Sequence, residues 1–101
     1  MSGRRELKIP RPIWAHSALT PSEIMAAWKS GADFVKVFPC SLLGGPSYMS
    51  ALKAPFPQIP LIASGGVNQQ NAAAFIHAGA VALGIGRDLI HADAVGRRED
   101  G

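Results

Sequence analysis

Short apolar runs alternate with helix-like segments through the middle of this 101-residue chain, and no other feature limits its fold as much. Each apolar run has the length of a strand, and the stretch after it places apolar residues three and four positions apart, as on one helix face. Glycine and proline separate the segments. This alternation is typical of strand–helix units on a parallel sheet, so we expect an α/β fold with about four such units.

Caps and breakers set the expected boundaries. Thr20-Pro21-Ser22-Glu23 matches a capping box, in which the threonine hydroxyl accepts from the glutamate amide and the proline needs no donor. The expected helices run from this box to Gly31, over residues 46–53, and from a cap at Asn68 to Gly79. The expected strands are residues 12–16, 33–38, 59–63 and 80–83, and Gly84-Ile85-Gly86-Arg87 follows the last as a glycine turn leading into one helical turn.

Lys36 decides the functional prediction. Alternation along its strand puts Phe34, Lys36 and Phe38 on one face, with no acidic residue in register. Desolvation between aromatic rings favours the neutral amine, a nucleophile that condenses with a carbonyl carbon. Near the carboxyl end of a strand in a parallel barrel, this amine would point into the face where active sites lie. The alternative is a lysine whose ammonium reaches solvent from the strand end, and spacing alone does not separate the two.

Two glycine-bearing turns predict a seat for an anion. Ser64-Gly65-Gly66 follows the third expected strand, and Gly84-Ile85-Gly86-Arg87 follows the fourth. Glycines let backbone amides approach an anion closely, the helix expected at Asn68 adds its positive end, and Arg87 has a fork of donors. We therefore expect a phosphate or carboxylate to bind between the turns. Either turn alone also has a steric explanation, because strand–helix turns commonly use glycine.

Composition argues against several classes of protein. The net charge is +3, but the basic residues gather near the two ends, which argues against a nucleic-acid-binding face. No apolar run approaches the roughly 18 residues of a membrane span, and the first residues lack a signal-peptide core. A single cysteine, Cys40, rules out an internal disulfide and cysteine-based zinc cages. We expect a cytoplasmic protein that binds no nucleic acid and no membrane.

The histidines and the cysteine are weaker candidates for chemistry. His16, His77 and His91 show no metal-ligand spacing. We expect structural roles for His77 and His91, and a place at the rim of the site for His16. Cys40 has no base nearby in the sequence, so burial and packing are its expected role.

Residues 12–90 resemble the C-terminal half of the 2-keto-3-deoxy-6-phosphogluconate / 4-hydroxy-2-oxoglutarate aldolase family, which are class I aldolases on a TIM (β/α)8 barrel. The most specific parts are Ala18-Leu19-Thr20-Pro21-Ser22-Glu23-Ile24, Val35-Lys36-Val37-Phe38-Pro39, Leu43-Gly44-Gly45-Pro46 and Ser64-Gly65-Gly66-Val67-Asn68. The resemblance implies about four of the eight barrel units. The implied divisions are a polar N-terminal segment at 1–11, a half-barrel domain at 12–92 and a polar C-terminal tail at 93–101.

The resemblance also implies an activity, that of an aldehyde-lyase. Lys36 would form a Schiff base with a keto acid or phosphorylated keto acid, and the protonated imine accepts the electrons released when the carbon–carbon bond breaks. The implied substrates are of the 2-keto-3-deoxy-6-phosphogluconate or 4-hydroxy-2-oxoglutarate type, giving pyruvate or glyoxylate plus an aldehyde. The implied chemistry requires no metal and no cofactor. Substrate binding would fall to Phe38, Ser64, Gly65, Gly66, Gly86 and Arg87.

The chain departs from the family pattern at positions that bear on activity. His16-Ser17 stands where the family usually has Pro-Gly, Ala63 where it has proline, and Arg87 where it has a small residue. The family's proton-shuttling glutamate and carboxylate-holding arginine belong to the upstream half of the barrel, and nothing here replaces them. The alternative is therefore a catalytically incomplete half-barrel, which either associates with a second copy or an upstream half-barrel or has no activity. A third possibility is a phosphate-binding module that uses the glycine turns alone.

Overall fold

The computed structural model describes residues 14–93, so the polar segment expected at 1–11 and nearly all of the tail expected at 93–101 lie outside the described residues. Five strands of this part form a sheet in the order β1-β2-β3-β4-β5. They are β1 (Ala15–Ala18), β2 (Phe34–Val37), β3 (Leu61–Ser64), β4 (Ala82–Ile85) and β5 (Asp88–His91). The first four run parallel to one another, which confirms the expected strand–helix units.

The end of the sheet differs from the prediction. We expected Gly84-Ile85-Gly86-Arg87 to be a glycine turn followed by a helical turn. Instead, Gly84 and Ile85 belong to β4, Gly86 and Arg87 connect the strands, and β5 returns antiparallel with Asp88 opposite Ile85. The physical reason is that the outer edge of β4 has unpaired backbone groups, and a two-residue connection lets the next segment satisfy them.

The first helix forms where the sequence predicts it. Helix α1 (Pro21–Lys29) begins at a complete capping box, in which the Glu23 amide donates to Thr20 Oγ1 over 3.3 Å. In return, the Thr20 amide donates to Glu23 Oε1 over 3.0 Å. Ile24 and Ala27 are buried against the sheet, and Trp28 is partly buried beside them. The capping box and the apolar spacing therefore both describe the real helix.

The other helices are short. A 3-10 helix, η2 (Cys40–Leu43), precedes α2 (Pro46–Lys53), and α3 is confined to Ala72–His77. We expected α3 to begin at a cap on Asn68. Instead, the Asn68 side-chain oxygen accepts from the amides of Gln70 and Asn71 over 2.8 and 3.0 Å, which holds residues 68–71 in a turn. The helix begins only after that turn, because the asparagine offers the backbone a local alternative to the helical bonds.

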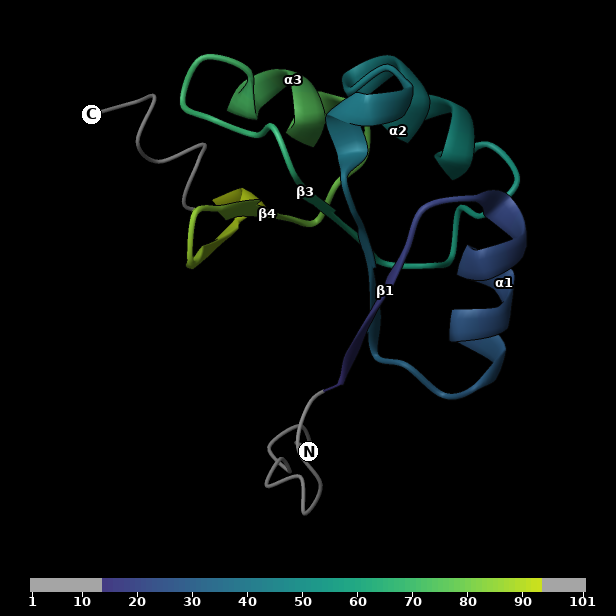
Figure 1. Cartoon of the computed structure of the whole chain (residues 1–101). Helices are drawn as coiled ribbons and strands as arrows, with labels where there is room; N and C mark the ends of the chain where they lie inside the picture. The colour runs from purple at the N-terminus through teal and green to yellow at the C-terminus, as the bar shows by residue number, and fades with distance from the viewer. Residues whose placement is uncertain (1–13, 94–101) are drawn as a thin grey trace.

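The three α-helices gather on one side of the sheet, where the core lies (Figure 1). Val35 and Val37 of β2 point into this core and are fully buried together with Phe75 and Met49. Because successive side chains of a strand point to opposite faces, Lys36 faces away from the helices. We call this helix-free side the open face. By register and alternation it includes Ser17, Phe34, Lys36, Ile62, Ser64, Ala82 and Leu89.

None of the helices formed by the described residues has the length and apolar character that crossing a lipid bilayer requires.

Candidate active site

Lys36 lies near the carboxyl end of β2, on the open face. Its register partners are Ser17 on β1 and Ile62 on β3, so neither neighbouring strand places an acidic residue opposite the amine. The side chain is half-buried. We expected aromatic rings to enclose it, but Phe38 is 50% exposed and, among residues 14–93, no helix covers this face. The amine is therefore accessible from the open face and less enclosed than predicted.

Two hydroxyl groups share the open face with Lys36. Ser64 ends β3, two residues beyond Ile62, and therefore points to the same side. It lies opposite Gly84, and a Cβ on that glycine would come within 2.9 Å of Ser64 Oγ, so the glycine leaves room for the hydroxyl. Ser17 lies directly opposite Lys36, and our sequence analysis gave it no role. Alternation along β1 combined with the strand pairing would have identified it.

The turn after β3 is packed tightly against the segment after β2. Gly65 and Gly66 have φ of +88° and +87°, a region that side chains other than glycine rarely adopt. A Cβ on Gly65 would lie 2.7 Å from Pro39 Cα, and one on Gly66 would overlap the Ser41 side chain. Ser41 Oγ donates to the Gly65 carbonyl over 2.6 Å. Close packing therefore requires both glycines.

The second turn lies at the same edge of the sheet. Gly86 and Arg87 follow β4, which is the neighbour of β3, and both residues are exposed. The turns after β3 and β4 are thus adjacent, as the anion seat requires, although the second contains two residues rather than four. The positive helix end expected at Asn68 is not there, because α3 begins at Ala72.

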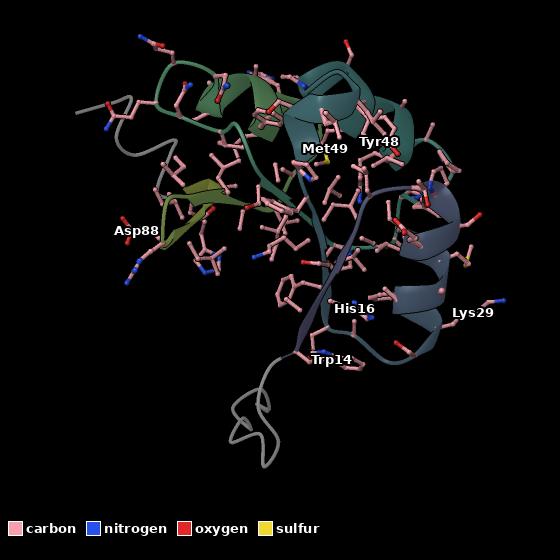
Figure 2. The ribbon with its side chains drawn as sticks, in the orientation of Figure 1. Trp14, His16, Lys29, Tyr48, Met49 and Asp88 are labelled. Atoms are coloured by element: carbon pink, nitrogen blue, oxygen red, sulfur yellow. The ribbon has the colours of Figure 1, made fainter. Side chains whose placement is uncertain are left out.

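Cys40 and His16 lie away from the amine. Cys40 is fully buried, and desolvation raises the pKa of its thiol to about 11, which suits packing rather than nucleophilic chemistry. His16 stacks on Trp14, with ring centroids 5.8 Å apart, near the end of β1 remote from Tyr48 (Figure 2). His16 is in register with Val35 and so faces the other side of the sheet from Lys36. The rim position that we expected for it is therefore wrong.

Within residues 14–93, no three side chains of the His, Cys, Asp and Glu types come together as a set that could hold a metal ion. His77 ends α3 and is exposed, and His91 lies opposite Ala82 on β5, also exposed.

Comparison with known proteins agrees with this architecture. The 2-dehydro-3-deoxy-6-phosphogalactonate aldolase of Escherichia coli (strain K12) is 43% identical over 74 residues, which are 72% of this chain and 36% of that protein. The 2-dehydro-3-deoxy-phosphogluconate aldolase of Pseudomonas aeruginosa is 40% identical over 55 residues, or 54% of this chain and 25% of that protein. The chain thus spans between a quarter and about a third of these relatives.

Solved structures give the same picture. A structure described as native KDPGal has a TM-score of 0.68 and 35% identity over 82% of this chain and 42% of that chain. A cube-shaped protein cage, designed by fusing symmetric oligomeric domains, has a TM-score of 0.63 and 38% identity over 66% of this chain and 25% of its own. These likenesses agree with a partial (β/α) barrel.

The family model described as KDPG and KHG aldolase matches residues 14–100. The matches support the family but not our expected placement of the chain in the C-terminal half of the barrel. The named relatives are aldolases, which are lyases. A partly parallel sheet with its helices on one side, together with a match across most of the sequence, shows that this chain belongs to the KDPG and KHG aldolase family.

Proposed function

We propose that this chain contributes the imine-forming part of a class I aldolase, with Lys36 as the nucleophile. The observation that supports this most directly is the position of the lysine, which is accessible on the open face, faces no acid in register, and lies near the carboxyl ends of parallel strands. Active sites of parallel barrels form at that end. No carboxylate opposite this amine holds it in an ion pair, so the amine can add to a carbonyl group once it has lost its proton.

Beyond the amine, the proposed chemistry needs an acid–base group that both accepts and donates a proton. The Lys36 amine adds to the C2 carbonyl of a 2-keto acid, and the carbinolamine loses its hydroxyl as water to give a protonated imine. The imine accepts the electron pair from the breaking C3–C4 bond, while the acid–base group takes the proton of the C4 hydroxyl and leaves C4 as the carbonyl of the aldehyde. The resulting enamine takes up a proton at C3, and water then releases pyruvate and the free amine.

The remaining predicted residues fit a substrate with a second anionic group. Ser64 shares the open face with Lys36, and alternation continued past the end of β2 puts Phe38 on that face too, so both would lie near the carbon that the amine attacks. Gly65 and Gly66, with Gly86 and Arg87 on the neighbouring turn, would hold a phosphate or carboxylate at the far end of the substrate. This supports substrates of the 2-keto-3-deoxy-6-phosphogluconate or 4-hydroxy-2-oxoglutarate type, as the family description, KDPG and KHG aldolase, also suggests.

Reductive trapping tests the role of Lys36. The chain is incubated with pyruvate and sodium borohydride, digested, and analysed by mass spectrometry for the 1-carboxyethyl adduct that reduction of the imine leaves on the lysine. We expect the adduct on the peptide that contains Lys36 and its loss in Lys36→Met. An unmodified Lys36 in a folded chain would rule out the proposed function.

Two other lysines serve as controls. Lys53 is the rival amine, because desolvation lowers its pKa, but its Nζ donates to the carbonyls of Ile59 and Pro57 over 2.6 and 3.2 Å. Lys29 extends from α1 into solvent (Figure 2). Lys53→Met and Lys29→Met should both keep the adduct at Lys36.

A second candidate function is that of an incomplete half-barrel that acts only in association with another chain. One observation favours it, namely that apolar side chains of the open face remain accessible, with Phe38 50% and Leu89 56% exposed. Apolar surface of this kind commonly marks an interface. If association covers the open face, sedimentation equilibrium should show an oligomer that Leu89→Ser weakens. The matched change Leu42→Ser, at a 68% exposed residue of η2, should not weaken it.

A further inference from the structure

We propose that Ser41 and Asn71 are positioning residues that fix the direction of two backbone amides in the turn after β3, and thereby its affinity for a phosphate. This inference rests on the proposed function, since it concerns the anion seat of the same site. It concerns two side chains that touch the turn rather than the substrate, and neither was a site residue in our sequence analysis.

Ser41 holds the first carbonyl of the turn twice. Its hydroxyl donates to the Gly65 oxygen over 2.6 Å, and its backbone amide donates to the same oxygen over 3.1 Å. The peptide between Gly65 and Gly66 is planar and trans, so its N–H points opposite to its C=O. Because the carbonyl is directed at Ser41, the Gly66 N–H is directed away from η2.

Asn71 holds the next carbonyl. Its side-chain Nδ2 donates to the Gly66 oxygen over 2.9 Å, and the same planarity directs the Val67 N–H away from Asn71. The Asn71 side chain is itself fixed, because its Oδ1 accepts from the Asn68 amide over 2.8 Å. One end of the amide group is therefore held by the loop while the other end orients the turn.

The two oriented amides lack partners within the described part of the chain, although only Gly66 is exposed and Val67 is buried. Within residues 14–93, neither the Gly66 nor the Val67 amide donates a hydrogen bond to another group of the chain. Gly66 is exposed, and the carbonyls that would repel an anion are turned toward protein donors. Successive backbone amides in a turn of this kind form a concave anion site. Ser41 and Asn71 thus set the geometry of the seat without occupying it.

The test separates phosphate affinity from imine formation. Inorganic phosphate is titrated into the full chain by calorimetry, and backbone amide NMR shifts are followed in parallel. We expect the Gly66 and Val67 amides to shift most. Ser41→Ala and Asn71→Ala should each weaken phosphate binding about five- to tenfold, the cost of roughly one hydrogen bond. Ser41→Thr, which keeps the hydroxyl, should restore much of the affinity.

The controls make the outcomes distinct. Ser50→Ala, at an exposed serine of α2, should leave phosphate affinity unchanged. Pyruvate trapping at Lys36 should persist in Ser41→Ala and Asn71→Ala, so a loss of trapping would indicate general misfolding, which circular dichroism would detect. Equal phosphate affinity in all variants, or shifts confined to other amides in the unaltered chain, overturns this inference while leaving the imine chemistry at Lys36 intact.

Discussion

The phenolic oxygen of Tyr48 donates a hydrogen bond of 2.6 Å to the carbonyl oxygen of Leu19, across 29 positions of sequence. This bond ties α2 to the loop between β1 and α1, immediately after Ala18. The Phe38 amide donates to the Ala18 carbonyl over 3.0 Å, so the end of β1, where this loop starts, is also held by the residue that follows β2. These two bonds therefore connect three segments near the carboxyl ends of β1 and β2, and one of the bonds comes from the tyrosine.

Replacing Tyr48 with phenylalanine tests this connection. Tyr48→Phe keeps the ring and removes the donor, so the partly buried Leu19 carbonyl loses its partner. We expect the free energy of unfolding to fall by about 1 kcal/mol, as measured by urea denaturation. The matched change Phe38→Tyr, at an exposed ring, should alter the free energy of unfolding by less than that. Equal stability of Tyr48→Phe and the unaltered chain would mean that the bond contributes nothing.

The capping box makes the stability of the folded chain depend on pH. Hydrogen bonds from the Thr20 amide, and then from the Leu19 amide, hold the pKa of the Glu23 carboxyl below its ordinary value of 4.5. Because the folded-state pKa is the lower one, the stabilisation is fully present above pH 4.5 and disappears as the pH falls through the folded value. Glu23→Gln should therefore be less stable than the unaltered chain at neutral pH, with the difference shrinking in acid.

A matched substitution identifies the source of this dependence. Asp88 lies on the exposed strand β5, outside the capping box, and Asp88→Asn should leave the acid dependence unchanged. Chemical denaturation at a series of pH values measures both variants. A Glu23→Gln chain that lost stability in acid as steeply as the unaltered chain would show that other carboxyl groups are responsible.

Cys40 should be unreactive while the chain is folded. With a thiol pKa of about 11, only about one thiol in a thousand is ionised near pH 8, and the sulfur is fully buried. Iodoacetamide should therefore alkylate Cys40 slowly in buffer and rapidly in concentrated urea, as followed by intact mass. Rapid labelling of the native chain would show that the η2 segment opens readily.

The two glycine turns should differ in how much stability an alanine substitution costs. A Cβ on Gly65 would lie 2.7 Å from the backbone of Pro39, whereas one on Gly86 would have no atom within 4 Å. Both residues have positive φ, so each alanine variant bears the conformational cost of about 1 kcal/mol. We expect Gly65→Ala to lose clearly more stability than Gly86→Ala in thermal denaturation. Equal losses would show that the loop at Pro39 moves aside.

Local patterns in the sequence predicted much of the fold. The capping box at Thr20 predicted the start of α1, and alternation along β2 predicted the face on which Lys36 lies, because both depend only on neighbouring residues. The sequence did not predict elements whose position depends on contacts with other parts of the molecule. Strand β5 depends on the free edge of β4, and no pattern within Asp88–His91 records that edge. The late start of α3 depends on the side chain of Asn68.

In the candidate site, too, some residues can be predicted from the sequence and others only from the structure. Lys36 and the glycines stand out by residue type, so the sequence alone singles them out. Ser41 contacts Gly65 across 24 positions, and a lone serine in a loop has no periodicity that would reveal the contact. Ser17 became visible only when the pairing of β1 with β2 placed it opposite Lys36. Supporting residues of this kind require coordinates.

The antiparallel strand β5 has a consequence for assembly. A complete barrel closes by adding a parallel strand at the outer edge of β4, and β5 already occupies that edge from Asp88 to His91. Any incoming strand must first displace β5 and break its hydrogen bonds to β4. The rate at which a second polypeptide closes the barrel should therefore be set by the displacement of β5 rather than by diffusion.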